Sequence, residues 1–366
     1  MLPSSPLSEP VLLLDEPRVR RNIKRMADRA HQGGVRLRPH FKTHQSREIG
    51  RWFRDFGVET ITVSSLAMAE YFADDGWTDI TLAFPFHRGM QRRIDALAAS
   101  LRIGITLADA DALEGVRFRA PVDAWIKIDV GSHRTGLDAG DPDGLRGLAG
   151  VWAGRDDLRL RGLLAHAGHS YAARGIDGIA AVHAESQRLL DKLREDISST
   201  IGNIEISIGD TPTCSRASAF PGVDEIRPGN FVFYDLSQWQ IGACTVDDIA
   251  LAMACPIVAR HPQRNQLVVH GGAVHFSKDS MTIDGQRVFG MAVDVDAHAW
   301  GPLRTDIRLV ALSQEHGIVE APREFIENAR LGDALHFLPV HSCLTADTMG
   351  RYCTLDGRRL SSMRRS

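Results

Sequence analysis

The stretch VRLRPHFKTH, residues 35–44, opens with the alternating apolar residues Val35 and Leu37 and ends in a group of basic side chains around Lys42. Ahead of it, Asp15-Glu16-Pro17 is typical of a helix N-terminus, with an N-cap aspartate and a proline in the first turn. Apolar residues then recur at helical spacing, namely Val19, Ile23, Met26, Ala27 and Ala30. The pattern predicts a helix that leads into a strand.

This alternation continues along the first two thirds of the chain. The eight strand candidates are Val35–Pro39, Glu59–Ser64, Asp79–Phe84, Leu101–Leu107, Val122–Val130, Leu158–His166, Asn203–Gly209 and Val223–Arg227. Strands that are connected through helices run parallel. Eight of them predict an α/β fold, a (β/α)8 barrel of the TIM type. An open, doubly wound sheet is the alternative.

The pattern changes after about Ala243. Strand-like runs separated by turn residues follow at Ala254–Arg260, Gln266–Val269, Gly290–Val295, Thr305–Leu312 and Ala334–Leu338, and only Arg323–Ala329 looks helical. We therefore expect a barrel domain over residues 12–243 and a mostly β domain over residues 244–366, which could include residues 1–11.

Composition excludes several classes of function. The 366 residues carry a net charge of −3, so neither nucleic acid nor an anionic membrane is an expected partner. No apolar run is long enough to span a bilayer, and the first ten residues lack the features of a signal peptide. Five scattered cysteines favour a reducing, cytoplasmic location over a disulfide framework.

Polar or glycine-rich clusters follow five of the eight runs, where barrel enzymes place their active sites. They are Arg38–His44, Lys127–Arg134, His166–Tyr171, Gly209–Thr213 and Arg227–Asn230. The last two suit a phosphate, because glycine lets backbone N–H groups approach an anion and threonine adds a hydroxyl donor. Simple turn glycines are the alternative. Nucleotides are not favoured, because no GxxxxGK[ST] or strand-linked GxGxxG motif occurs.

Lys42 is the candidate nucleophile of this predicted site. A lysine amine becomes reactive when burial or nearby positive charge disfavours its cation, and His40, His44 and Arg38 could supply such a field. A lysine near a phosphate cradle is what pyridoxal phosphate requires. A solvated surface lysine is the alternative.

His341-Ser342-Cys343 follows the apolar run Leu335–Val340. Residues i and i+2 of an extended chain point the same way, so that this imidazole and thiol could bind one ion. A nitrogen and a sulfur ligand favour zinc, and two protein ligands leave positions open for water or substrate. A buried structural cysteine is the alternative.

Five motifs together resemble a known family: RPHFKTH (38–44), GLLAHAGHSY (162–171), GDTPT (209–213), RPGNFVFYD (227–235) and PVHSC (339–343). From about Leu12 to Asp347, the chain resembles the zinc-dependent D-serine dehydratase and D-threonine aldolase family. These are fold-type III pyridoxal phosphate enzymes related to alanine racemase. The resemblance implies an N-terminal barrel, a C-terminal β domain, a homodimer and a D-amino acid substrate.

The resemblance also implies roles for individual residues. Lys42 would carry the cofactor and move protons at the substrate α-carbon. Thr211, Gly229 and Asn230 would hold the phosphate, Arg134 and Tyr171 would contact the pyridine ring with His166 nearby, and His341 and Cys343 would hold zinc beside the β-hydroxyl. His44 is a candidate base for retro-aldol cleavage.

These parts serve two reactions, dehydration to a keto acid and ammonia or retro-aldol cleavage to glycine and an aldehyde. Cys343 favours dehydration of D-serine, D-threonine or 3-hydroxy-D-aspartate, since HxC accompanies the dehydratases of this family and HxD its aldolases. A racemase, a non-catalytic pyridoxal phosphate carrier and a metal-dependent barrel hydrolase are further alternatives. Val340 and Phe231 depart from the family pattern, and the segment His270–Asp279 has no assigned role.

Overall fold

The structure is a computed structural model that describes residues 7–152, 155–296 and 299–364. The chain divides into two compact units. The barrel unit comprises Lys24–Lys42 and Arg51–Phe231. The β unit comprises Met1–Ile23, Thr43–Gly50 and Val232–Ser366. Both units are therefore discontinuous in sequence, and the predicted domain limits at residues 243 and 244 stay a prediction.

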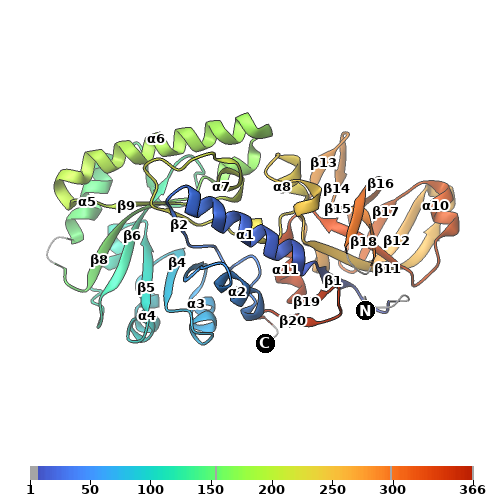
Figure 1. The fold of residues 1–366 in the computed structure, drawn as a ribbon, viewed down its shortest axis with the longest axis horizontal. Helices are drawn as coiled ribbons and strands as arrows, with labels where there is room; N and C mark the ends of the chain where they lie inside the picture. The colour runs from blue at the N-terminus through green and yellow to red at the C-terminus, as the bar shows by residue number, and fades with distance from the viewer. Residues whose placement is uncertain (1–6, 153–154, 297–298, 365–366) are drawn as a thin grey trace. The chain divides into compact units, whose positions relative to one another are not determined.

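The barrel unit contains the eight parallel strands that the sequence predicts (Figure 1). They are β2 (Arg36–Leu37), β3 (Thr60–Val63), β4 (Asp79–Pro85), β5 (Arg102–Leu107), β6 (Val122–Asp129), β8 (Leu158–Ala165), β9 (Glu205–Ile208) and β10 (Glu225–Ile226), while the short β7 (Leu137–Asp138) pairs with β6. The sheet closes where His40 forms a parallel bridge with Thr62. The open-sheet alternative is thereby excluded.

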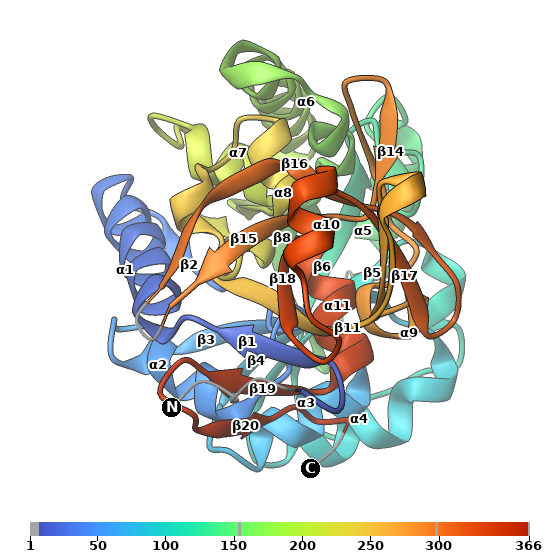
Figure 2. The ribbon, with the colours of Figure 1, turned by 90° about the vertical axis from the view of Figure 1, so that its right-hand side faces the viewer.

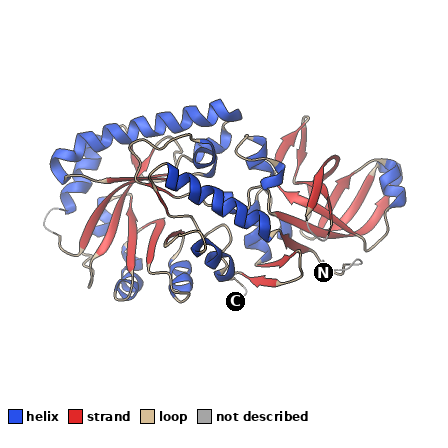
Figure 3. Ribbon diagram, viewed as in Figure 1, coloured by secondary structure: helices blue, strands red, loops and turns tan. Residues whose placement is uncertain are grey.

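Helices flank these strands, as Figure 3 shows. Their bounds are α1 (Glu16–Gln32), α2 (Arg47–Arg54), α3 (Leu66–Ala73), α4 (Gln91–Ala98), α5 (Pro142–Trp152), α6 (Gly175–Ile201) and α7 (Thr211–Arg216). The expected N-cap of α1 is present, because the carboxylate of Asp15 accepts a hydrogen bond from the backbone N–H of Arg18 at 2.9 Å.

The β unit is built on a nine-stranded sheet in the order β12-β17-β16-β15-β18-β11-β1-β19-β20. The strands are β1 (Val11–Leu14), β11 (Leu251–His261), β12 (Gln266–His270), β15 (Gly290–Val295), β16 (Trp300–Leu312), β17 (His316–Glu320), β18 (Ala334–Pro339), β19 (Arg351–Thr354) and β20 (Arg359–Ser361), with β13 (Met281–Ile283) and β14 (Gln286–Val288) as a separate hairpin. Figure 2 shows β1, β19 and β20 side by side.

Among the described residues of this unit, four short helices accompany the sheet: α8 (Leu236–Gln240), α9 (Ala273–Phe276), α10 (Arg323–Asn328) and α11 (Ser342–Met349). The expectation of a single helix after Ala243 is wrong, because α9 and α11 also form. α9 has only four residues, and half of the eight residues of α11 are Ser, Thr or Asp, so that neither segment shows a clear apolar periodicity. All five cysteines are free thiols, and none of the described helices is long and apolar enough to cross a membrane.

Candidate active site

Lys42 follows β2 directly after a tightly packed residue. The ring of Phe41 is fully buried and lies 4.9–5.1 Å, centroid to centroid, from the rings of Phe53, Phe72 and Trp77. The backbone N–H of Phe41 also donates to the carbonyl of Thr62 at 2.9 Å. These contacts fix the backbone beside Lys42, whose own side chain is exposed.

The positive field around Lys42 does not come from the residues that the sequence suggested. Arg38 is neutralised by ion pairs of 2.7 Å with Glu225 and 2.6 Å with Asp79. Burial lowers the pKa of His44 to about 3. Burial also lowers the pKa of His40 well below its ordinary value, and repulsion from Lys42 adds to the effect. Both histidines are therefore neutral at pH 7.

Three other cations supply the field, and sequence reasoning assigned no role to two of them, Lys127 and Arg227. Burial, together with repulsion from Arg227, Arg134 and Lys42, lowers the pKa of Lys127 to about 7. Burial lowers the pKa of Arg227 to about 10, although Glu225 opposes this shift. Such a group of cations favours binding of an anion. The sequence does contain a sign that Lys127 has a special role, because this lysine lies within an apolar run, where an unpaired charge is costly.

Arg134 belongs to a loop that folds around one carboxylate. Oδ1 of Asp129 accepts hydrogen bonds from the backbone N–H groups of Gly131, Ser132 and His133 at 2.8–3.1 Å. Oδ2 of Asp129 accepts from the N–H of Arg134 at 2.9 Å. This network sets the position of the Arg134 backbone at the end of β6, and the Arg134 side chain is exposed.

His166 and Tyr171 lie together after β8. Their ring centroids are 6.3 Å apart. Burial, then repulsion from Lys42 and Arg134, holds the pKa of His166 well below its ordinary value, so its ring is neutral. The barrel unit thus brings Lys42, His166 and Arg134 within electrostatic range of one another.

The two segments predicted to hold phosphate differ in how far they are buried. Thr211 is fully buried, and its hydroxyl has no hydrogen-bond partner within the described part of the chain. Asn230 is 5 % exposed, whereas Gly229 is half-buried. Because a buried hydroxyl without a partner is costly, Thr211 fits an anionic oxygen as its missing acceptor. The residues present therefore fit the phosphate of pyridoxal phosphate.

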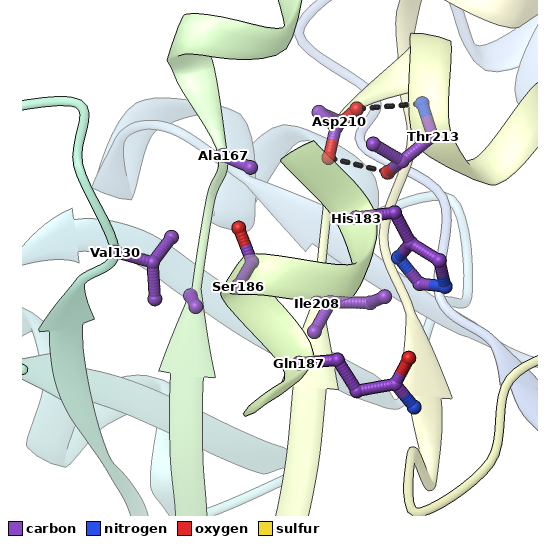
Figure 4. A pocket seen from close by; sticks show the side chains of 9 residues that line it. Val130, Ala167, His183, Ser186, Gln187, Ile208, Asp210 and Thr213 are labelled. Carbon is purple, nitrogen blue, oxygen red and sulfur yellow. Dashed lines mark hydrogen bonds between the residues drawn. The ribbon is translucent and has the colours of Figure 1, made fainter. Parts of the chain in front are cut away.

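Asp210 organises the backbone next to Thr211. Its carboxylate accepts from the backbone N–H of Thr213 at 2.8 Å, from the hydroxyl of Thr213 at 2.6 Å and from that of Ser170 at 2.9 Å. Figure 4 shows the bonds to Thr213 beside a cavity of about 10 Å³. That volume admits about one water molecule, so the cavity is no substrate site.

His341 and Cys343 lie where β18 leads into α11. His341 is the extended N-cap residue of α11, and Cys343 lies in the first helical turn. The pair therefore forms at a strand-to-helix junction and not within an extended strand as the sequence argument assumed. The hydroxyl of Thr43, the residue that follows Lys42 in the chain, lies 3.3 Å from the sulfur of Cys343.

The surroundings of His341 favour a cation. Burial alone would lower its pKa, but the Cys343 thiolate, Asp235 and Asp279 together raise the pKa of His341 to about 10. Nδ1 of His341 lies 2.5 Å from Oδ2 of Asp279. An imidazole nitrogen and a thiol sulfur are a donor set typical of zinc, so these residues fit a metal ion.

A second group of metal-type side chains lies elsewhere in the β unit. His270, His275 and Glu315 offer ligand atoms that all lie within 4.8 Å of one another. Nδ1 of His275, however, accepts a hydrogen bond from the backbone N–H of Gly272 at 3.1 Å. The neutral ring then carries its proton on Nε2, which faces Glu315 at 3.8 Å. We interpret this group as an electrostatic contact between two histidines and Glu315.

Comparison with known proteins defines the class first. The family model "Alanine racemase, N-terminal domain" matches residues 14–237, and the family model "Putative serine dehydratase domain" matches residues 250–355. The first match alone covers more than half of the chain. The eight-stranded barrel with a lysine after its first strand is thus of the alanine racemase type.

Two individual relatives identify the family more specifically. The chain is 32 % identical to a D-threo-3-hydroxyaspartate dehydratase of Delftia sp., over 95 % of this chain and 94 % of the relative. It is 28 % identical to a D-serine dehydratase of Dictyostelium discoideum, over 94 % and 93 % of the two chains. The chain belongs to this family of D-serine dehydratase-like enzymes with an alanine racemase-type barrel, which are lyases dependent on pyridoxal phosphate.

One similar solved structure gives information about metal binding in the family. It is a D-threo-3-hydroxyaspartate dehydratase, a cysteine-to-alanine mutant described in the metal-free form. It has a TM-score of 0.87 and 27 % identity to this chain, and the match covers 98 % of this chain and 99 % of the other. Because this mutant of the relative is described as metal-free, we infer that the relative itself can bind a metal.

Proposed function

We propose that this protein is a zinc- and pyridoxal phosphate-dependent dehydratase of D-β-hydroxy amino acids, which converts D-serine, D-threonine or 3-hydroxy-D-aspartate to a keto acid and ammonia. The observation that carries the proposal is the paired imidazole and thiol of His341 and Cys343 in a chain whose barrel unit gathers cations around Lys42. The dehydratase relatives support it.

Each barrel residue has a stated part in this proposal. Lys42 would bind the cofactor covalently and remove the proton from the substrate α-carbon. Thr211, Gly229 and Asn230 would bind the phosphate, while Arg134, His166 and Tyr171 would orient the pyridine ring. The cations Lys127 and Arg227 add the positive potential that an anionic cofactor and a substrate carboxylate require.

His341 and Cys343 would hold the metal that prepares the leaving group. When bound, pyridoxal phosphate withdraws electrons from the α-carbon, and a zinc ion polarises the β-hydroxyl. A thiolate ligand favours zinc over harder ions such as manganese. His44 is not retained as a base, because its side chain is 1 % exposed and its pKa is about 3.

We also propose a homodimer in the cytoplasm. The homodimer follows the resemblance to the family. The cytoplasmic location is supported by the five free thiols, since disulfides are rare in reducing compartments.

Product analysis tests the proposed reaction. The protein, loaded with pyridoxal phosphate and zinc, is incubated with D-serine, D-threonine and D-threo-3-hydroxyaspartate, and keto acid, ammonia, aldehyde and glycine are quantified. Keto acid and ammonia in equal amounts are expected from at least one substrate. Aldehyde and glycine would instead identify an aldolase, and a change of the α-carbon configuration alone would identify a racemase.

A further inference from the structure

Asp279 ends the segment His270–Asp279, to which the sequence assigned no role. Its Oδ2 atom lies 2.5 Å from Nδ1 of His341, and both side chains are about one third exposed, 38 % and 36 %. A carboxylate that accepts a hydrogen bond from one ring nitrogen leaves the lone pair of the other nitrogen for a metal. We infer that Asp279 is a positioning residue that holds His341 so that Nε2 binds the metal.

Asp279 does not qualify as a third ligand beside His341 and Cys343. Among the described residues, these three side chains offer no set of ligand atoms that all lie within 4.8 Å of one another, whereas His270, His275 and Glu315 do. Asp279 therefore acts on the metal through the imidazole of His341. The metal keeps positions open for water and substrate, as a catalytic zinc site requires.

The fold holds Asp279 in place through α11, the helix that also carries Cys343. The hydroxyl of Thr345 donates to the carbonyl of Phe276 at 2.9 Å, and the hydroxyl of Thr348 donates to the carbonyl of His275 at 2.9 Å. Both acceptors belong to α9, which ends just before Asp279. Two threonines of one helix thus bind the segment that supplies the carboxylate.

The turn between α9 and Asp279 is strained, which indicates that its shape matters. Ser277 combines a φ of +76° with a ψ of 177°, a region that non-glycine residues rarely enter. The hydroxyl of Ser277 then accepts a hydrogen bond from the N–H of Asp279 at 3.2 Å. Phe276, which is buried, packs its ring 6.0 Å from that of Phe337 and anchors the turn.

Metal affinity, measured without turnover, tests this inference, which rests on the metal site of the proposed function. Zinc dissociation constants are measured by competition with a chromophoric chelator for the wild-type protein, Asp279→Ala and Asp279→Asn. Asp279→Ala is expected to weaken zinc binding by about 10- to 100-fold, the usual loss for a partner of a metal-binding histidine. Asp279→Asn is expected to lose less, because its amide oxygen still accepts a hydrogen bond.

Asp294→Asn is the matched control, since it removes the same charge from an aspartate of the β unit that is 76 % exposed. It is expected to bind zinc as the wild-type protein does. Cobalt substitution adds a second readout, because the charge-transfer band between cobalt and the Cys343 thiolate should persist in Asp279→Ala. Loss of that band would mean that Asp279 shapes the whole site and would overturn the positioning role.

The outcomes separate this inference from the proposed function. If the wild-type protein binds no zinc, or binds it equally well after His341→Ala, the metal site itself is wrong. If His341→Ala abolishes zinc binding but both Asp279 variants bind zinc as tightly as the wild type, only the role of Asp279 is overturned. Retention of the cofactor absorption band in every variant shows that the barrel unit is intact.

Discussion

Two lysines lie near the ends of barrel strands, and we infer different roles for them because one is exposed and the other is buried. Lys42 is exposed, whereas Lys127 is 5 % exposed. An exposed amine can reach a bound aldehyde, as a covalent attachment of the cofactor requires.

Lys42→Ala is therefore expected to abolish the visible absorption band of lysine-bound pyridoxal phosphate, whereas Lys127→Met should retain it. Absorbance after reconstitution with the cofactor measures both effects. Lys192→Ala, an exposed lysine on α6, is the control for loss of a lysine. A band that survives in Lys42→Ala but disappears in Lys127→Met would exchange the two assignments.

Lys127 also predicts a pH dependence of stability in the cofactor-free protein. Its pKa is about 7 when folded, against 10.5 ordinarily. Between these values the unfolded chain binds the extra proton, so the free energy of unfolding should rise with pH. The penalty is full below pH 7 and disappears as the pH approaches the unfolded value.

The comparison with Lys127→Met isolates this contribution. Urea titrations at pH 7, 8 and 9 should show the wild-type protein gaining stability relative to the variant as the pH increases. Parallel pH profiles for the two proteins would show that Lys127 is not a buried, destabilised cation.

At the scale of residues, the sequence could predict only what local motifs reveal. Lys42, His341 and Cys343 stand out because reactive residues are grouped within a few positions. Thr43 and Asp279 were missed because their partners Cys343 and His341 are 300 and 62 residues away in sequence. Such contacts depend on the tertiary fold, which no local pattern encodes.

At the scale of elements, one buried carboxylate connects the barrel strands β10 and β2 through ion pairs. Glu225 on β10 is fully buried and forms ion pairs of 2.8 Å with Arg36 and 2.7 Å with Arg38, both of which lie in or just after β2. The two guanidinium groups hold the pKa of Glu225 below its ordinary value although burial opposes the shift. The pair of strands β2 and β10 therefore depends on a charged contact as well as on hydrogen bonds.

Glu225→Gln is expected to lower the free energy of unfolding by about 3–5 kcal/mol, because Arg38 would remain buried with less compensation. Denaturant unfolding of the metal- and cofactor-free protein measures the loss. Glu195→Gln, an exposed glutamate on α6, should leave stability unchanged within about 0.5 kcal/mol. Equal stability of both variants would contradict the structural role of Glu225.

The sequence predicted the barrel strands more completely than the short helices of the β unit. Most of the barrel strands are rich in apolar residues and are bounded by turns and helices, so that their number and order could be predicted. Helices α9 and α11 were not predicted, because they show no clear apolar face in sequence and are fixed by tertiary bonds such as that from Thr348 to the carbonyl of His275. Tertiary contacts, and not local propensity, decide whether such helices form.

At the scale of the whole molecule, the chain is interleaved between its two units. The β unit takes β1 from the start of the chain, and β1 pairs with β11 and β19 from its second half. Residues Thr43–Gly50 also belong to the β unit, although Lys42 just before them belongs to the barrel unit. No sequence pattern predicted this interleaving, since strand pairing across such distances leaves no local signal.

The most direct test of the account follows the α-hydrogen of the substrate. D-Serine and D-threo-3-hydroxyaspartate, each deuterated at the α-carbon, are given to the protein loaded with pyridoxal phosphate and zinc, and rates and products are compared with those of unlabelled substrate. We predict keto acid and ammonia, slower turnover of the deuterated substrate, and loss of turnover on removal of zinc. Glycine that retains the deuterium, or undiminished dehydration without a metal, would contradict this prediction.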